Sequence, residues 1–416
     1  MEVHILINQN PFFANSATAN RWLTLLEGLA ALNTPVKLWI TGGYQTATER
    51  ENAGLSGKKN GVQYTYLHHW VNDTLWKRRW HQYVLRHWQQ RWASWHLSRI
   101  HWNNHCILWT ENDLLLWKLA HKLAARNKQL KLFAEMSEFL DIHHFNIGNK
   151  LQKMAGDKKQ RYFERKYLYA LSGFALMTHR LLEHYSAFSG RLPALMHLPM
   201  TVDLERFEAK QAPVNDYVSP YLLFVGVMND AKDGVNLLIQ AFAQVAPSFP
   251  DHKLYLVGGW NYDTPAHLEL IDRLGMQKRI FWQGEVSRNT IPALLQHAEL
   301  LVLPRPDSKQ AQGGFPTKLG EYLASGKPVV ATRVGELPRY LEDGESVFFC
   351  QPGSTDSLTD ALNRALSSPS LMRQVGLNGR EVAKKHFNKN IQSKLLKEFF
   401  EQMFIKKPLL QNENQQ

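Results

Sequence analysis

Short apolar runs and longer amphipathic stretches alternate along the whole chain. Runs of four to eight apolar residues are typical of buried strands, and apolar positions three or four apart are typical of helices. In the first half this pattern predicts strands at Val3–Asn8, Val36–Thr41, Val62–His68, Ile107–Thr110, Lys131–Glu135, Phe174–Thr178 and Ala194–Leu198. It predicts helices at Asn15–Leu32, Leu75–Arg99, Leu114–Arg126 and Leu151–Leu171. Alternation of this kind predicts parallel sheets covered by helices, an α/β fold.

The pattern also divides the chain. The polar interval 203–220 contains Pro213 and Pro220 and is typical of a linker, and strand-helix units start again at Tyr221. We therefore expect a first domain at 1–205 and a second at 206–386. A further helix is expected within 387–406, and residues 407–416, rich in Lys, Pro, Gln and Asn, are expected to form a flexible tail.

Composition adds limits on location. The 416 residues are 44% apolar and would fill two ordinary cores. No run approaches the ~18–20 apolar residues of a membrane-spanning helix, and the chain enters a strand at Val3 without the pattern of a signal peptide. The two cysteines, Cys106 and Cys350, fit neither a disulfide framework nor a metal site. A reducing cytoplasm is the expected location.

The segment Gly313–Gly326, GGFPTKLGEYLASG, is the most informative part of the chain. Its glycine pair opens a loop whose backbone can approach a ligand closely. Pro316 suits the start of a helix, where free backbone N–H groups form an anion site. Lys318 adds a cation there, and Glu321 follows about one turn later. A phosphate site beside a carboxylate that can accept from hydroxyls fits a nucleotide sugar.

This segment resembles the nucleotide-binding signature of the group 1 glycosyltransferases, retaining enzymes with the GT-B architecture. The resemblance covers nearly all of residues 220–400 and is looser in the first half, where Pro199–Phe207 carries it. It includes Leu223–Gly226, Lys232–Val235, Leu254–Gly259, Leu301–Pro304, Thr332–Pro338, Leu341–Val347 and Pro352–Gly353. It implies two facing Rossmann-like domains, with the donor bound by the second, the acceptor by the first, and the C-terminal helix crossing back onto the first.

The resemblance also implies a donor site. Glu321 matches the second glutamate of the family's E-x7-E motif and is expected to bind the ribose, the alternative being a surface glutamate on a helix. Two positions depart from the family: Gly313 replaces the first glutamate, and Val227 replaces an arginine. The expected donor-binding residues are Gly226, Gly313, Gly314, Phe315, Pro316, Thr317, Lys318 and Glu321.

Lys232 is expected to place an ammonium near the pyrophosphate, where charge builds up as the glycosidic bond breaks. The alternative is a solvated lysine in a polar turn. The sequence has no D-x-D motif that would hold a divalent cation on the diphosphate. We therefore expect a metal-independent transferase without a cofactor, in which Lys232, helix amides and Lys318 replace the ion.

In the first half, Glu138 follows the strand Lys131–Glu135, at a position where the family often has a histidine or glutamate facing the transferred sugar. We expect Glu138 to act in catalysis with Lys232 and Glu321; a loop carboxylate or helix cap is the alternative. Acceptor or cleft contacts are expected from residues at the ends of other strands: Asn15, Ser16 and His179. For Asn15 and Ser16, capping of the next helix is the alternative.

The net charge of +12 suggests anionic partners. The segment Trp76–Trp102 holds six tryptophans among six lysines and arginines, and several tryptophans recur three or four residues apart. A basic helix with tryptophans on one side suits an anionic membrane surface. The alternative is a helix that packs its aromatics on the first domain's sheet. Nucleic acid is not an expected partner.

Taken together, the sequence predicts a retaining glycosyltransferase that moves a sugar from a UDP or GDP sugar to an acceptor hydroxyl. The expected acceptor is a glycan or lipid-linked glycan of bacterial surface polysaccharide or glycolipid assembly, at the inner face of the plasma membrane. Two alternatives stay open: a sugar-nucleotide-binding protein that has lost transfer, and a nucleotide-sugar epimerase on the same architecture.

Overall fold

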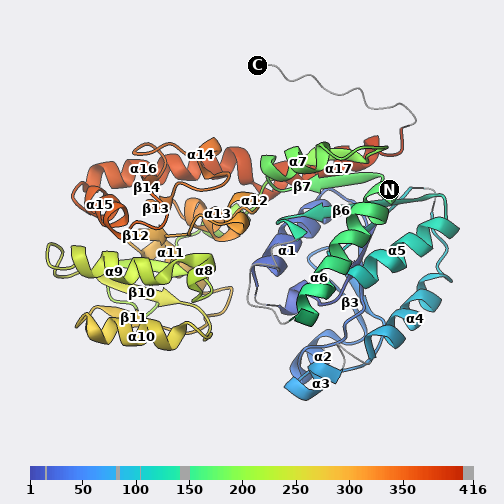
Figure 1. The fold of residues 1–416 in the computed structure, drawn as a ribbon, viewed down its shortest axis with the longest axis horizontal. Coiled ribbons are helices and arrows are strands. Elements are labelled where there is room, and N and C mark those ends of the chain that lie inside the picture. The colour runs from blue at the N-terminus through green and yellow to red at the C-terminus, as the bar shows by residue number, and fades with distance from the viewer. Residues whose placement is uncertain (15, 81–84, 104, 141–149, 406–416) are drawn as a thin grey trace. The chain divides into compact units, whose positions relative to one another are not determined.

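The computed structural model describes residues 1–14, 16–80, 85–103, 105–140 and 150–405. It consists of two compact units, and each is a parallel sheet with helices packed on both faces (Figure 1). The first unit is Met1–Leu198 together with the chain from Asn390 on, and the second is Pro199–Lys389. The boundary thus lies at Leu198 rather than 205, because the segment expected to be a linker packs within the second unit.

The sheet of the first unit has the strand order β3-β4-β2-β1-β5-β6-β7-β8. All neighbours are parallel except the edge pair β3 and β4, which is antiparallel. Every expected strand is present, and β3 was not predicted, because its sequence SGKK is short and polar. The strands are β1 (Glu2–Ile7), β2 (Val36–Ile40), β3 (Ser56–Lys59), β4 (Val62–Tyr66), β5 (Cys106–Thr110), β6 (Leu130–Met136), β7 (Gly173–Leu176) and β8 (Ala194–His197).

The side chains of successive residues in a strand point to opposite faces of this sheet. In β5, Cys106 and Leu108 join the core under α4, α5 and α7, whereas Ile107 and Trp109 join the core under α1 and α17. The C-terminal helix α17 therefore completes the first unit, through Phe400 among others. The helices are α1 (Ala17–Ala31), α2 (Ala47–Ala53), α3 (Leu75–Trp80), α4 (Arg86–Leu97), α5 (Leu114–Arg126), α6 (Lys150–Tyr162), α7 (His179–Ser186) and α17 (Lys389–Gln402).

Two of the expected helices differ in detail. The helix expected at Leu75–Arg99 is described as α3 and α4, with residues 81–84 outside the described part. The helix expected at Leu151–Leu171 ends as α6 and continues through a wider turn at Phe163–Tyr167 and a 3-10 turn at Leu168–Ala170. The tail expected at 407–416 also lies outside the described residues.

The second unit has a six-stranded sheet in the order β11-β10-β9-β12-β13-β14, parallel throughout. Counted from its first strand, this is the order 3-2-1-4-5-6 of the Rossmann fold. The strands are mostly apolar because both faces are covered. They are β9 (Tyr221–Val225), β10 (Lys253–Val257), β11 (Ile280–Trp282), β12 (Leu300–Leu303), β13 (Val329–Thr332) and β14 (Phe348–Cys350).

One face of this sheet packs on α9, α10, α15 and α16, and hydrogen bonds tie β9 to α11 and α13, through Tyr221 to Leu294 and Val225 to Tyr322. The helices are α8 (Asp230–Asp233), α9 (Val235–Val245), α10 (Thr264–Arg273), α11 (Ile291–His297), α12 (Lys309–Gly313), α13 (Thr317–Ala324), α14 (Leu337–Tyr340), α15 (Thr355–Leu366) and α16 (Pro369–Val382). None of the described helices has the length and apolarity that a membrane-spanning segment needs.

Candidate donor site and the acidic edge of the first unit

Strand order locates the ligand edge of the second unit. From β9 the chain continues to β10 on one side, and from β12 it continues to β13 on the other. In such sheets, ligands bind beyond the carboxyl ends of the two strands where the order reverses. Here those ends are Gly226, after β9, and Pro304-Arg305, after β12.

A buried ion pair lies at this edge. Lys318, in the first turn of α13, donates from Nζ to Oδ1 of Asp233 over 2.7 Å, and its ammonium stands 4.7 Å from the ring centroid of Phe224. Burial lowers the pKa of Lys318, and the charge of Asp233 opposes this shift. Lys318 therefore loses its proton at a lower pH than a solvated lysine does.

The Asp233 carboxylate is held in place by the glycine that follows it. Gly234 has φ of +66°, a left-handed conformation that favours glycine, and a Cβ there would lie 2.2 Å from the backbone oxygen of Pro304. The turn after α8 is thus packed directly on the loop after β12. This accounts for the Lys232-Asp-Gly motif: the glycine allows the contact, and the contact positions the aspartate.

Positive charge exceeds negative charge around Lys318. Besides burial, the charges of Lys232 and Arg305 lower the pKa of Lys318, while that of Asp233 raises it. Arg305 is buried and donates to the backbone oxygen of Gln310 over 3.3 Å. Lys318, Lys232 and Arg305 together make this edge attractive to an anion with more than one negative charge.

The start of α13 adds backbone dipoles. Pro316 is the N-cap, one residue before the first turn, and no side chain caps the helix there. The first N–H groups of an uncapped helix are available to an anion. Phe315 is buried and packs against Tyr340 and Phe387, with ring centroids 5.7 and 5.3 Å away. That packing fixes the loop that leads into the helix. Gly313 ends α12 and Gly314 is its C-cap.

Gly226 lies against the lysine. A Cβ built there would be 2.1 Å from Lys318 Nζ and 2.8 Å from the ring of Phe224. Only a residue without a side chain leaves the ammonium in its present position.

We expect Gly226→Ala to displace the Lys318 ammonium and to lower the affinity for a nucleoside diphosphate by about tenfold, since one charge-assisted contact is worth roughly 1.5–3 kcal/mol. The displaced ammonium leaves the buried Asp233 carboxylate without its partner, so the melting temperature should fall as well. Calorimetric titration and thermal unfolding would measure the two effects. Leu377→Ala is the control, because this side chain of α16 is 50% exposed. Unchanged affinity in Gly226→Ala would remove Lys318 from the site.

Glu321 is partly buried and paired. Nη1 of Arg206 donates to its Oε1, and Nη2 of Arg206 donates to the backbone oxygen of Arg288 over 2.6 Å. The alternative of a solvated surface glutamate is therefore wrong. Sequence reasoning missed Arg206, although it stands in the Pro199–Phe207 segment that resembles the family. Of the expected site residues, the structure brings together Gly226, Lys232 and Lys318 at the ligand edge, and α13 carries Lys318 and Glu321.

Thr317, also expected to bind the donor, is the first residue of α13. The remaining expected residues belong to the first unit. Ser16 is the N-cap of α1 and accepts from the N–H of Ala19 over 3.1 Å, so its capping role is confirmed. Asn15 lies outside the described residues. His179 is the first residue of α7, with its ring 4.1 Å from that of His197. Glu138 lies two residues beyond β6, at the carboxyl edge of the sheet.

Glu135, three residues before Glu138, has a structural role. It is buried, accepts from Nη2 of Arg21 over 3.2 Å, and accepts from the hydroxyl of Ser137. Nη2 of Arg21 also donates to the backbone oxygen of Leu198 over 2.9 Å. This buried pair joins α1, β6 and the end of the β8 segment.

Acidic and basic side chains also gather beyond the carboxyl ends of β1 and β5, where the strand order of the first sheet reverses. Glu111 accepts from the backbone N–H of Asn8 over 2.8 Å, and burial raises its pKa. Asp113 caps α5 and pairs with Arg86. Burial lowers the pKa of Lys159, against the charges of Asp113 and Glu111. Sequence reasoning missed this set, although Glu111 directly follows a predicted strand.

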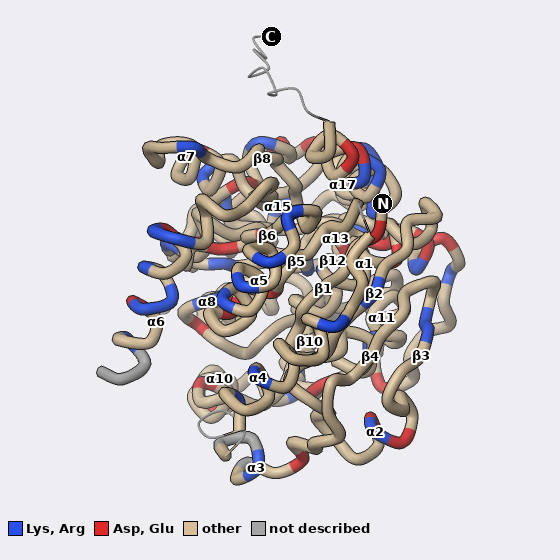
Figure 2. Tube along the Cα trace, turned by 90° about the vertical axis from the view of Figure 1, so that its right-hand side faces the viewer, with Lys and Arg blue, Asp and Glu red and all other residues tan. Residues whose placement is uncertain are grey.

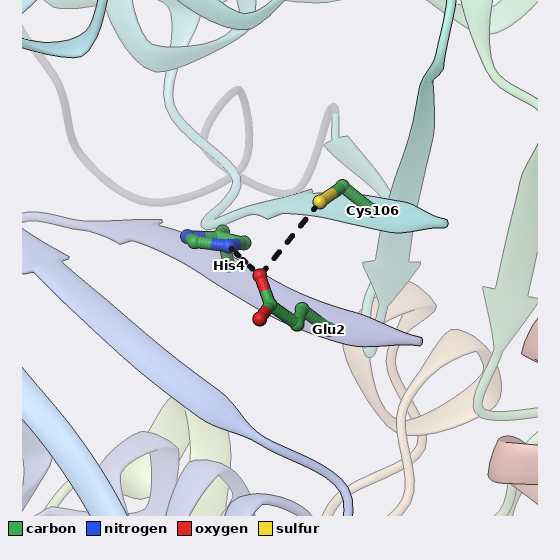
Figure 3. A group of neighbouring side chains, drawn as sticks. All are labelled: Glu2, His4 and Cys106. Atoms are coloured by element: carbon green, nitrogen blue, oxygen red, sulfur yellow. Dashed lines mark hydrogen bonds and ion pairs between the residues drawn. The ribbon is translucent and has the colours of Figure 1, made fainter. Parts of the chain in front are cut away.

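A third cluster lies at the opposite, amino edge of the first sheet. Glu2 accepts from Nε2 of His4 over 3.3 Å, and the sulfur of Cys106 lies 4.0 Å from the same carboxylate oxygen (Figure 3). Trp39 donates its indole N–H to Nδ1 of His4 over 3.1 Å, which places the histidine proton on Nε2, toward Glu2. Metal binding through Nε2 would need the other tautomer, so this is a closed hydrogen-bonded set.

Comparison with known proteins agrees with the geometry of the second unit. Residues 219–368 match the family model described as "Glycosyl transferases group 1". This part of the second unit is thus similar to the group 1 glycosyltransferases. The matched range contains Gly226, Asp233, Lys318 and Glu321 of the candidate site, whereas Arg206 lies outside it.

Two curated relatives are similar over part of their length. The MMP alpha-(1->4)-mannosyltransferase of Mycolicibacterium hassiacum is 30% identical over 47% of this chain and 46% of its own. The GDP-mannose-dependent alpha-(1-6)-phosphatidylinositol monomannoside mannosyltransferase of Mycolicibacterium smegmatis is 30% identical over 48% of this chain and 53% of its own. The chain thus matches about half the length of these relatives.

The fold likeness extends over nearly the whole chain. Anabaena HepE, solved in complex with UDP and glucose, superposes with a TM-score of 0.70 at 15% identity, over 96% of this chain and 99% of HepE. At this identity the likeness concerns the fold alone. The fold of two Rossmann-like units in series is GT-B, as the sequence predicted.

Proposed function

We propose that this protein is a glycosyltransferase that moves a sugar from a nucleoside diphosphate sugar to an acceptor hydroxyl. The observation that carries the proposal is the Lys318–Asp233 pair beside an uncapped helix start, at the strand reversal of a group 1 glycosyltransferase domain. Cations and helix amides there suit a diphosphate. Glu321, one turn further along α13, suits the ribose.

The proposed reaction retains the configuration of the anomeric carbon. The acceptor oxygen attacks that carbon on the face from which the diphosphate leaves. The bond between the carbon and the diphosphate oxygen breaks with its electron pair, and the acceptor proton passes to a phosphate oxygen. Lys232, Lys318 and Arg305 stabilise the negative charge that develops on the diphosphate. We assign these cations the place that a divalent metal takes in other transferases, and we assign Glu138 the contact with the transferred sugar.

For the acceptor we propose a glycan or a lipid-linked glycan in bacterial surface polysaccharide or glycolipid assembly, bound by the first unit from the cytoplasmic side. The name of the Mycolicibacterium smegmatis relative, which specifies a phosphatidylinositol monomannoside, supports a lipid-linked acceptor. The polar set around Glu111 and Asp113 lies at the ligand edge of the first sheet and offers hydroxyl-binding groups.

A sugar-nucleotide-binding protein without transfer is the second candidate, favoured by the departures at Gly313 and Val227. Release of free nucleotide from the donor separates the two, because a pure binder releases none. A nucleotide-sugar epimerase would instead interconvert the donor without an acceptor.

The test is calorimetric titration with UDP and GDP in the presence of EDTA, repeated across pH. One nucleotide should bind, and its affinity should fall as pH rises, because the lysine must be protonated to bind the anion. Since the pKa of Lys318 is lowered from 10.5, the fall should begin below that value and approach about tenfold per pH unit. The terminal phosphate has a pKa of about 6, so its charge does not change over the alkaline range in which the lysine loses its proton.

Lys318→Arg is the control, because arginine keeps its charge in this range. Its affinity should fall less steeply with rising pH than that of the wild type. No binding of either nucleotide to the wild type would overturn the proposed donor and favour a role without sugar nucleotides.

A further inference from the structure

Five tryptophans of the first unit are exposed on two neighbouring helices. Trp76 and Trp80 lie on α3, and Trp88, Trp92 and Trp95 lie on α4. Their side chains are 67, 42, 68, 52 and 43% exposed, in that order. Exposed large apolar side chains gathered in one place mark an interaction surface. We call these five residues the tryptophan face.

The tryptophans of α4 point away from the core. Ala93 and Leu97 are buried and belong to the core of the first unit. Trp88, Trp92 and Trp95 follow one another at four- and three-residue steps, which places them on one side of a helix, well away from the buried side. The alternative, in which these aromatics pack on the sheet, is therefore wrong for all five. It holds for Trp102, which is in the core.

The tryptophan face is ordered by its own contacts. Trp76 stacks on Trp80 with ring centroids 5.3 Å apart, and Trp92 stacks on Trp95 at 5.2 Å. The indole N–H of Trp92 donates to the backbone oxygen of Leu67 over 2.9 Å. Each stack covers one face of each of its two rings, a face that a nucleic-acid base would need for stacking. A surface of this kind fits the headgroup layer of a bilayer better than it fits nucleobases.

Basic residues outnumber acidic ones around the tryptophan face, although Lys77 pairs with Asp73 and Arg86 with Asp113. Residues 74–110 contain six lysines and arginines and no aspartate or glutamate. The guanidinium of Arg99 lies over the Trp95 ring, 3.5 Å from its centroid, and Arg91 is exposed on α4. Figure 2 shows blue basic positions along this α3–α4 stretch. Indoles flanked by cations complement an anionic headgroup layer.

We propose that the tryptophan face docks this protein on an anionic lipid bilayer. The indoles enter the headgroup layer while Arg91 and Arg99 bind lipid phosphates, so that α4 lies in the plane of the membrane. This proposal rests on the proposed function in one respect: the bilayer would present the lipid-linked acceptor. The docking itself needs no transfer and is tested without it.

The experiment is flotation of the full chain with vesicles of phosphatidylcholine containing about 30% phosphatidylglycerol, and with vesicles of phosphatidylcholine alone. Trp76→Ala/Trp88→Ala removes the two most exposed indoles of the tryptophan face and should lower vesicle binding by about tenfold. Arg91→Gln/Arg99→Gln should lower it by about 25-fold, since each basic residue contributes about fivefold at an anionic surface. Trp260→Ala, in the second unit and 60% exposed, is the control and should float like the wild type.

Equal flotation with both vesicles, no flotation, or an equal loss in the Trp260→Ala control would overturn the proposal. So would a stable dimer whose dissociation is needed to expose the tryptophans, or an oligonucleotide that displaces the protein from vesicles. Calorimetry with UDP and GDP on the same variants keeps the two proposals apart. Retained nucleotide binding in a variant that no longer floats shows a folded protein with a lost docking surface. If the wild type floats with vesicles but binds no nucleotide, the docking proposal is kept and the proposed sugar-nucleotide donor is rejected.

Discussion

Lys318→Met is expected to lower the affinity for the bound nucleoside diphosphate by about 10- to 100-fold, the value of a charge-assisted contact, and to lower the transfer rate further, since the same cation stabilises the leaving group. The substitution also leaves Asp233 buried without its partner: among the described residues, nothing hydrogen-bonds its Oδ2, and Oδ1 is held by the lysine. Breaking a buried pair in this way costs about 3–5 kcal/mol of stability.

The two consequences can be separated with a second variant. Lys318→Met/Asp233→Asn removes both charges, so the free energy of unfolding should return most of the way to the wild-type value. Nucleotide affinity should stay low, because the cation is still missing. Titration calorimetry and urea unfolding measure the pair of effects. Should the double variant regain affinity together with stability, Lys318 would be a structural lysine, and the diphosphate would have to be held by Lys232 and Arg305.

The sequence predicted the elements of the fold because each one depends on neighbours along the chain. The strand runs and the helix spacing are local patterns, and all the expected strands of the first unit are present. The expected boundary between the units differs from the observed one because its position depends on tertiary packing. The polar segment 203–220 was predicted to be a linker, yet Arg206 and Phe207 pack within the second unit. Likewise, the tryptophans of α4 showed helical spacing but not which side of the helix was buried.

The site was predictable in its residue types and less so in its pairings. Gly226, Lys318 and Glu321 were found from local motifs. Asp233 and Arg206 were missed as partners because the pairs join residues 85 and 115 positions apart. A single sequence does not show which distant carboxylate neutralises a given cation. It also favoured Glu138 over its neighbour Glu135, whose burial against α1 becomes visible only in three dimensions.

Glu321→Gln is expected to lower nucleotide affinity by about 10- to 100-fold, because an amide that replaces the carboxylate accepts hydroxyl protons without charge assistance. The sharper readout uses a nucleotide that lacks both ribose hydroxyls. If Glu321 binds the ribose, the wild type should bind the 2′,3′-dideoxy nucleotide about as weakly as Glu321→Gln binds the ordinary one. The variant itself should distinguish the two nucleotides much less than the wild type does, because its amide oxygen accepts from the hydroxyls more weakly.

The ion pair with Arg206 provides the competing explanation, since Oε1 of Glu321 already accepts from that guanidinium. If Glu321 served only to hold Arg206 and, through it, the backbone at Arg288, Glu321→Gln would weaken both nucleotides by the same factor. Arg206→Gln would then reproduce the loss. A ribose contact instead predicts that Arg206→Gln keeps the wild-type preference for the hydroxylated nucleotide, because its carboxylate is intact. The ratio of the two affinities in the three proteins therefore decides between a ligand contact and a positioning role, even if every variant loses stability.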